Sequence, residues 1–344
     1  MIVPILVFVG ALLIAFAATP VARRIAPKLG VMDHPNPRKV HARPMPLLGG
    51  VAIVIASILT LLIFQDRFEF QQLITILFGA AVVSLLGIYD DRWGLRPILK
   101  LIGQILAAGI LIASGVKVSA LPYEWLNILV TLMWVVGLTN SLNLLDNMDG
   151  LSSGVAAVCS AFFVVMAALS RQTYVGALSA ALLGASIGFL AYNFNPASIF
   201  MGDTGSMFLG FMLAAIGIKL RFPDNVPFVT WMVPVIVMGM PIFDTTLVFI
   251  SRLRRGKNPL TTPGKDHVSH RLVKLGFTTR EAVMTHYLIS GAYGMVAILV
   301  TQASIIEGYL LGGATGLVSL YGIWFFEFKR KRDPNSTMPQ PPSS

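Results

Sequence analysis

The sequence contains few charged residues for its length. Only 12% of its 344 residues are Asp, Glu, Lys or Arg, whereas a soluble domain has about 25%. Hydrophobic residues make up 55% of the chain, and the mean hydropathy is +0.75. This composition excludes an ordinary soluble protein and indicates an integral membrane protein.

Cysteine is also scarce, since Cys159 is the only one. A single cysteine excludes an intrachain disulfide and a set of thiolate ligands for a metal. Cys159 lies in an apolar stretch, where a cysteine is typically a small buried core residue. Acidic residues are fewer than basic ones, which gives a net charge of +10. Such an excess can indicate nucleic-acid binding, but the positions of the basic residues favour the membrane instead.

Long apolar stretches predict an all-α bundle of about eleven transmembrane helices, because about 17–25 apolar residues are needed to cross a bilayer. The ninth stretch contains Pro234, Gly239 and Pro241, which predict a bent helix. The predicted spans have these approximate limits: 3–21, 47–64, 73–89, 98–114, 126–144, 151–170, 173–194, 206–220, 228–250, 282–301 and 304–326.

The basic residues give this bundle an orientation. Of the 26 Lys and Arg residues, 21 fall after odd-numbered spans or in the C-terminal segment. Cytoplasmic loops carry such an excess, so we expect the N-terminus outside and the C-terminus in the cytoplasm. One transmembrane domain is predicted over residues 1–328. The tail at 329–344 starts basic, then becomes polar and proline-rich, which is typical of disorder.

Several aspartates lie at the ends of these spans on the predicted cytoplasmic side. A carboxylate within the membrane costs about 2.5–3.5 kcal/mol on insertion scales, so it usually has a function. Asp90 and Asp91 are adjacent and repel each other unless a divalent cation or strong donors neutralise them. The structural alternative is a helix end and turn, with Arg92 and Arg96 as partners.

The segment "NSLNLLDNMDG" at 140–150 places Asn140, Asn143, Asp146 and Asp149 three residues apart. On a helix this spacing forms one polar stripe, which ends at Gly150. Ligands that are all oxygen suit Mg²⁺ and do not suit zinc. The alternative is a helix cap with hydrogen bonds between helices.

Two further segments suit a phosphorylated substrate. Asp203 stands between glycines just before an apolar helix, where it is either an N-cap or part of a phosphate site. The loop at 251–282 is basic and contains His267 and His270, for which phosphate contact is favoured over zinc. The alternative for its basic residues is contact with anionic lipid. Together these features indicate Mg²⁺-assisted chemistry on a phosphorylated substrate at a membrane surface.

The motifs taken together resemble one family, the polyprenyl-phosphate N-acetylhexosamine-1-phosphate transferases of glycosyltransferase family 4 (MraY/WecA type). The resemblance rests on motifs in the family's order: "DD" at 90–91, "NSLNLLDNMDG", "YNFNPASIFMGDTGS", Pro-x-x-Asp at 241–244 and "DHVSHRL" at 266–272.

The resemblance implies a reaction and its partners. A UDP-N-acetylhexosamine donates sugar 1-phosphate to undecaprenyl phosphate, which gives undecaprenyl-pyrophosphoryl-sugar and UMP. Mg²⁺ is the implied cofactor, with Mn²⁺ as a substitute, and family members can form homodimers. The enzyme would lie in the bacterial plasma membrane with a cytoplasmic active-site cleft, and would start a cell-envelope polysaccharide pathway. Direct attack and a covalent aspartyl intermediate both stay open.

The resemblance also implies residue roles. The implied catalytic residues are Asp90, Asp91, Asp203 and His267, and the implied metal ligands are Asp203, Asn140 and Asp90. The implied substrate-binding residues are Lys39, His41, Asn140, Asn143, Asp146, Asp149, Asn193, Phe200, His270 and Arg271.

Two motifs depart from the family pattern. Ser269 stands where WecA-type members usually have a third histidine, and "DNMDG" replaces "DGLDG". The segment "MPLLGG" is closer to the WecA-like "PLVGG", which favours UDP-GlcNAc or a related donor. The alternatives are a phospho-MurNAc-pentapeptide transferase and, more distantly, an ion-coupled transporter, whose acids would lie near the membrane midplane.

Overall fold

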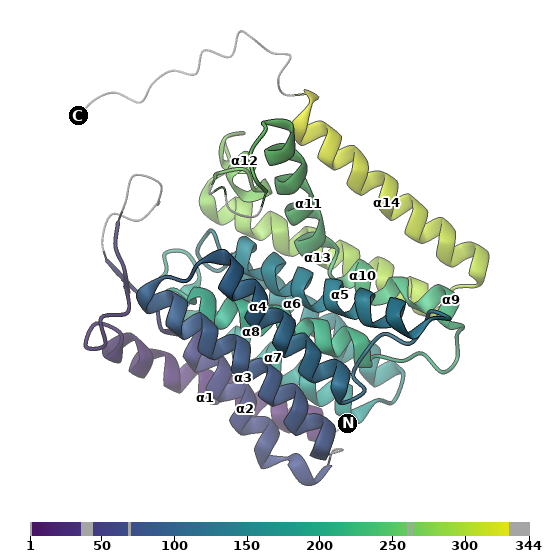
Figure 1. Ribbon diagram of the computed structural model, residues 1–344, viewed down its shortest axis with the longest axis horizontal. Coiled ribbons are helices and arrows are strands. Elements are labelled where there is room, and N and C mark those ends of the chain that lie inside the picture. Colours follow the sequence, from purple (N-terminus) through teal and green to yellow (C-terminus); the bar gives the residue numbers. More distant parts are fainter. Residues whose placement is uncertain (1, 36–43, 68–69, 260–261, 263, 330–344) are drawn as a thin grey trace.

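The computed structural model describes residues 2–35, 44–67, 70–259, 262 and 264–329. The elements follow one another along the chain as shown in Figure 1. Their bounds are α1 Ile2–Ile25, β1 Met32–Asp33, β2 Met45–Pro46, α2 Gly49–Ile63, a 3₁₀ turn Gln65–Arg67, α3 Phe70–Trp93, α4 Pro97–Ala113, α5 Glu124–Leu145, α6 Leu151–Leu169, α7 Thr173–Asn193, α8 Gly202–Lys219, α9 Pro227–Thr230, α10 Met232–Val237, α11 Gly239–Arg254, α12 Val268–Val273, α13 Thr279–Gln302 and α14 Ile305–Glu327.

The protein is a helical, multi-pass membrane protein, as the apolar stretches predict. Within the described residues, α1, α3, α5, α6, α7, α13 and α14 are each long and apolar enough to cross a membrane. The bent pair formed by 227–237 and 239–254 would add an eighth span. Helices α2 and α4 are apolar but shorter, so the count of eleven spans and their orientation stay predictions. The two-residue strands β1 and β2, paired antiparallel, were not expected.

Helix α8 forms the centre of the bundle. Every residue of α8 is buried except Asp203 and Lys219 near its two ends. Glycines let neighbouring helices approach it closely. A Cβ on Gly87 of α3 would lie 2.4 Å from the Thr204 backbone, and one on Gly50 of α2 would lie 2.2 Å from the Gly205 nitrogen. The end of α3 therefore lies directly against the first turn of α8.

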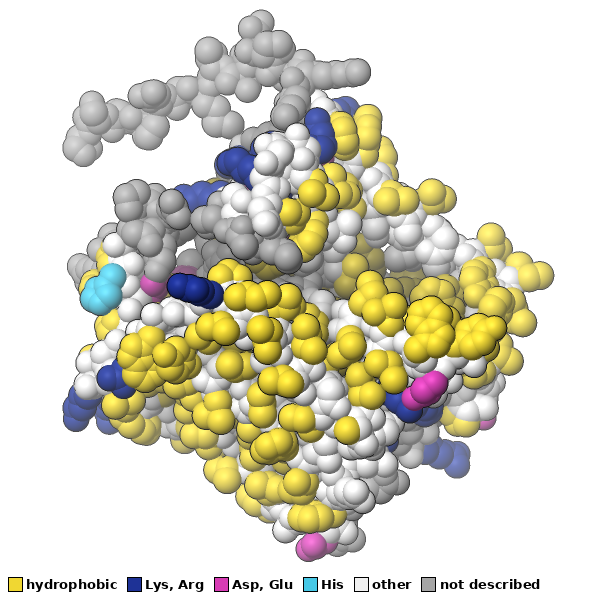
Figure 2. All heavy atoms as spheres, in the orientation of Figure 1, with side chains coloured by type: hydrophobic (Ala, Val, Ile, Leu, Met, Phe, Trp, Pro, Cys, Tyr) yellow, Lys and Arg dark blue, Asp and Glu magenta, His cyan; other side chains and the backbone are white. Residues whose placement is uncertain are grey.

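The outside of the bundle is apolar, as expected for a surface in contact with lipid. Hydrophobic side chains cover most of the face in Figure 2, and charged side chains lie mainly at its margins. Helix α14 is the extreme case. It lies at the edge of the bundle in Figure 1, and Ile306, Leu317 and Val318 are each about 70% exposed.

The predicted bend in the ninth span is confirmed. The two halves meet at an angle of 70°, at the junction of α10 and α11. Pro241 has no N–H to donate, so the carbonyl of Val237 loses its helical partner. The thiol of Cys159 donates to that carbonyl oxygen at 3.3 Å instead. Cys159 is thus buried, as predicted. Its thiol also gives a hydrogen-bond partner to a carbonyl that is left free at the bend.

Candidate active site

Three carboxylates and one ammonium group meet where α3, α4 and α8 come together. The Nζ of Lys100 lies 2.8 Å from Asp90 Oδ2 and 2.6 Å from Asp203 Oδ2. Lys100 therefore joins an aspartate from the end of α3 to one from the first turn of α8. We call Asp90, Asp91, Asp203 and Lys100 the acidic centre.

Asp91 holds the N-terminus of α8. Its Oδ1 accepts a hydrogen bond from the Asp203 amide at 2.8 Å. Its Oδ2 accepts from the Thr204 amide at 3.1 Å and from Thr204 Oγ1 at 2.7 Å. A carboxylate in this position satisfies free helix N–H groups and complements the helix dipole. Gly202 makes room for it, because its φ is +73° and a Cβ there would lie 2.6 Å from Asp91 Oδ2.

The loop between α5 and α6 brings two more aspartates to this end of the bundle. Burial raises the pKa of Asp146 well above its usual value, and the charges of Asp203, Asp91 and Asp149 raise it further. Asp146 thus lies within electrostatic reach of the acidic centre. Asp149 has a different role, since its Oδ2 accepts from the backbone N–H of Ala197 at 3.0 Å and from the side chain of Asn195 at 3.1 Å. It therefore fixes the loop that leads into α8.

Two of the asparagines form contacts between helices. Asn140 pairs its amide with Gln104 of α4, donating from Nδ2 at 2.5 Å and accepting at 3.3 Å. Asn143 donates to Ser206 Oγ at 2.9 Å, one turn beyond Asp203. Both side chains thus help to hold α4, α5 and α8 together beside the acidic centre.

Asn193 and Phe200 flank the loop before α8. Asn193 is buried; its Oδ1 accepts from the Gly150 amide and the Ser153 hydroxyl, each at 3.1 Å, and its Nδ2 donates to the Ile199 carbonyl at 3.0 Å. The Phe200 amide donates to the Pro46 carbonyl at 2.8 Å, and the Phe200 carbonyl accepts from the Gly49 amide at 3.0 Å. The loop is therefore fixed to the start of α2.

The predicted histidine motif lies on the short helix α12. The Nδ1 of His267 lies 2.7 Å from Asp244 Oδ2, and the amide of Val268 donates to Asp244 Oδ1 at 2.7 Å. Asp244 is buried in α11, so it fixes the start of α12. Burial, together with the charges of His267, Lys265 and Lys274, lowers the pKa of His270 to about 4. His270 is therefore neutral at neutral pH.

One hydrogen bond joins α12 to the loop between α5 and α6. The hydroxyl of the buried Ser269 donates to Asn147 Oδ1 at 2.6 Å, and Asn147 is the neighbour of Asp146 in sequence. Arg271 points the other way, donating to the Phe326 carbonyl at 2.7 Å and to Ser251 Oγ and Glu327 Oε2 at 2.8 Å. It also donates to the Asp266 carbonyl at 2.7 Å, so it joins α12 to the preceding loop, to α11 and to the end of α14.

The structure therefore brings Asp90, Asp91, Asp146 and Asp203 together and places His267, His270 and Arg271 on a second unit joined to them through Ser269. The assigned roles stay predictions. Lys39 and His41 lie outside the described residues. Sequence reasoning missed Lys100 as a site residue. Its position in Pro97-x-x-Lys100, one turn into the helix after Asp90, was the available signal.

The acids lie at one end of the bundle. Asp90 is in the last turn of α3, Asp146 directly follows α5, and Asp203 is the second residue of α8. A transporter would more typically have them near the midplane, so the arrangement favours an enzyme.

Comparisons with known proteins agree with this arrangement. The model for glycosyl transferase family 4 matches residues 73–221. A Bacillus subtilis protein described as a probable undecaprenyl-phosphate N-acetylglucosaminyl 1-phosphate transferase is 35% identical, over 88% of this chain and 86% of its own. A decaprenyl-phosphate N-acetylglucosaminephosphotransferase of Mycolicibacterium smegmatis is 32% identical, over 82% and 78%.

A more distant match is the phospho-N-acetylmuramoyl-pentapeptide-transferase of Bacillus subtilis, at 30% identity over 71% of this chain and 79% of its own. The fold and these matches define a membrane-embedded transferase. The chain belongs to glycosyl transferase family 4.

The donors of the acidic centre fit a hard cation. Within the described residues, no three His, Cys, Asp or Glu side chains converge closely enough to hold a metal alone. Mg²⁺, however, is commonly held by one or two carboxylates, with substrate phosphates and water as the other ligands. Asp90 and Asp203 supply two such carboxylates, and the Lys100 ammonium between them marks a position that attracts a cation.

Proposed function

We propose that this protein transfers N-acetylglucosamine 1-phosphate, or a related N-acetylhexosamine 1-phosphate, from a UDP-sugar to undecaprenyl phosphate. A phosphate oxygen of the acceptor would form a bond to the sugar-bearing phosphorus of the donor. The bond from that phosphorus to the bridging oxygen would break, which releases UMP and leaves a polyprenyl-pyrophosphoryl sugar. The printed names of the relatives at 35% and 32% identity support this choice of donor and acceptor.

The observation that carries the proposal is the position of Lys100 between Asp90 and Asp203. Phosphoryl transfer depends mainly on positioning and on neutralising charge that develops on the phosphate oxygens. The Lys100 ammonium would stabilise that charge, and the partly buried Asp90 carboxylate would accept a proton from the acceptor phosphate. Asp91 would act as a positioning residue, because its oxygens hold the amides of Asp203 and Thr204.

We also propose Mg²⁺ as the cofactor, held by Asp90 and Asp203. When bound, it would neutralise the phosphates of the donor. The neutral His270 and its neighbour His267 would contact the donor from α12. Asn147, bonded to Ser269, would hold this helix against the loop that carries Asp146.

The proposed location is the bacterial plasma membrane, with the acidic centre on the cytoplasmic face, where UDP-sugars are made. The excess of Lys and Arg in the loops at this end supports the orientation. A C-terminal green fluorescent protein fusion should be fluorescent in cells and a C-terminal alkaline phosphatase fusion inactive. The reverse result would contradict the proposed orientation but would not bear on the proposed reaction.

The test of the function is UMP release by the purified protein. Undecaprenyl phosphate and Mg²⁺ would be supplied, and UDP-GlcNAc, UDP-GalNAc and UDP-MurNAc-pentapeptide offered separately. We expect release with UDP-GlcNAc or UDP-GalNAc, lost on chelation of Mg²⁺ and in Asp90→Asn. Release with UDP-MurNAc-pentapeptide alone would assign the protein to the peptidoglycan branch. No release with any donor, while a family relative works in the same detergent, would contradict the proposal.

A further inference from the structure

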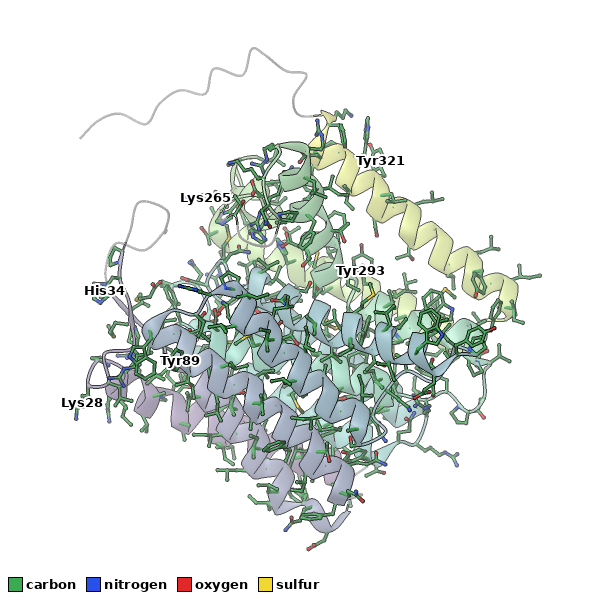
Figure 3. The ribbon with its side chains drawn as sticks, viewed as in Figure 1. Lys28, His34, Tyr89, Lys265, Tyr293 and Tyr321 are labelled. Carbon is green, nitrogen blue, oxygen red and sulfur yellow. The ribbon has the colours of Figure 1, made fainter. Side chains whose placement is uncertain are left out.

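A cavity lies on the other side of α12 from the acidic centre. It has a volume of about 220 Å³ and lies between the ends of α11 and α14, the loop before α12 and α12 itself. Lys265, on that loop, is labelled in Figure 3 beside α12. The charged residues that line it are Arg255, Lys265, Asp266, Arg271, Lys274 and Glu327.

The two carboxylates of this cavity are already neutralised by arginines. Asp266 lies 2.6 Å from Arg255 Nη2 and 3.4 Å from Arg252 Nε. Burial alone would raise the pKa of Asp266, but Arg255 and Arg252 outweigh it and keep the pKa below its usual value. Glu327 accepts from Arg254 at 2.9 Å and from Arg271 at 2.8 Å. Each carboxylate thus has two arginine partners.

The cavity therefore keeps an excess of positive charge. Lys265 and Lys274 line it in addition to the arginines, and Lys265 forms no ion pair with any other residue that the structure describes. The arginine side of the wall is held firmly, because Arg271 donates to the Asp266 and Phe326 carbonyls at 2.7 Å and to Ser251 Oγ at 2.8 Å. A fixed guanidinium beside exposed ammonium groups is well suited to phosphate oxygens.

The cavity opens where the lipid-exposed helix α14 ends. Tyr321 and Trp324 near this end are 59% and 47% exposed, and tyrosine and tryptophan side chains typically lie at the level of lipid headgroups. A basic pocket at that level can reach the phosphate of a lipid headgroup.

We propose that this cavity binds the phosphate of an anionic phospholipid headgroup and thereby fixes the position of α12 from the side opposite Asn147. The inference does not depend on the reaction that the acidic centre performs. The pKa of His270 is lowered mainly by burial and by His267, and the charges of Lys265 and Lys274 lower it further. The occupant of the cavity and the histidines of α12 therefore lie within electrostatic reach of each other.

The test is lipid binding by the full-length protein in native mass spectrometry. Phosphatidylglycerol and phosphatidylcholine with the same acyl chains would be titrated against the protein and against the double variant Lys265→Ala/Lys274→Ala. The matched control is Lys28→Ala/Lys257→Ala, which removes the same charge from two exposed lysines outside the cavity. The single variant Lys265→Ala changes one exposed residue, so it still tests the proposal if the double variant does not fold.

We expect the protein to prefer phosphatidylglycerol, and the double variant to bind it about tenfold more weakly or worse, given the attraction of each lysine for anionic lipid. The single variant should lose less, and the control should bind as the unaltered protein does. Hydrogen–deuterium exchange of residues 264–274 should slow when phosphatidylglycerol is added. Equal losses in the test and control variants, or no preference between the lipids, would overturn the proposal.

A parallel titration with inorganic phosphate tests whether the phosphate in the cavity belongs to a lipid headgroup or is free in solution. If inorganic phosphate leaves phosphatidylglycerol bound, the headgroup is the ligand. If it displaces the lipid at Lys265 and Lys274, the cavity is a site for free phosphate, which overturns the lipid as occupant.

Discussion

The acidic centre and the unit formed by α11, α12 and α14 are built in different ways. The acidic centre lies on helices that meet through glycines, so that Gly87 brings α3 onto the backbone of Thr204. The other unit has only a small hydrophobic core, which includes Leu247, Leu272 and Ile323, and it is joined further by polar bonds, such as those of Asp244 to His267 and of Glu327 to two arginines. Close backbone packing leaves little freedom for a side chain to move. Polar bonds between short segments can change one residue at a time.

This difference suggests a division of labour. The residues proposed to act on the phosphates are fixed by the core of the bundle. Those of α12 that are proposed to contact the donor lie on a unit whose polar bonds can vary. Asn147 and Ser269, one from each of the two motifs that depart from the family pattern, lie at the contact between the two regions. Variants that act on one region and spare the other can test this comparison.

The largest effect is expected at the acidic centre itself. Lys100→Met leaves Asp90 and Asp203 without their shared cation and removes a charge that would stabilise the transferred phosphate. Loss of one such group typically lowers the rate by about 10²–10³-fold. UMP release should fall by this amount with little change in the amount of folded protein. Lys117→Met, at a lysine that lies beyond the opposite end of α4 and pairs with Glu124, is the control and should keep full activity.

The second largest effect is expected at the contact between Gly87 of α3 and Thr204 of α8. Gly87→Ala would place a Cβ 2.4 Å from Thr204 Cα, so α3 and α8 must separate. Overpacking of this kind typically costs about 1–3 kcal/mol, and both Tm and activity should fall. Gly109→Ala on α4 is the matched control, since a Cβ there meets nothing within 4 Å. Equal Tm values for the two variants would argue against a rigid acidic centre.

Much of this architecture could be predicted from the sequence. The apolar stretches indicate the helices, the prolines indicate the bend, and the aspartates indicate the acidic end. The partners of these residues could not be predicted, because they depend on which helices meet. Nothing in "MGDTGS" shows that Asp91, 112 residues earlier, caps its helix, and nothing near Arg271 indicates Glu327 as its partner.

A smaller effect is expected where α12 begins. Asp244→Asn keeps the shape of the side chain but removes the charge that faces His267, so α12 should be held less firmly. We expect KM for the donor to rise by about 10-fold, in line with the loss of one buried charged hydrogen bond, while kcat changes less. Steady-state kinetics measure both. Thr246→Ala is the control, because Thr246 lies two residues further along α11 and its hydroxyl donates to the Ile242 carbonyl of the same helix. A pure loss of kcat would place Asp244 with the acidic centre instead.

The smallest effect is expected at the contact between the two regions. Ser269→Ala removes the 2.6 Å hydrogen bond to Asn147, which is worth about 1 kcal/mol, so KM for the donor should rise by about fivefold. Ser269→His alone should be worse, because position 269 is fully buried and a larger ring must displace its neighbours.

Combining Ser269→His with Asn147→Gly frees the space beside the new ring and restores the family residue at these two positions. The double variant should therefore recover activity that Ser269→His loses, and its donor preference should shift. A double-mutant cycle measures this coupling. If the two changes are simply additive, the pair acts independently, and the contact between α12 and the loop that carries Asp146 does not set how the donor is recognised.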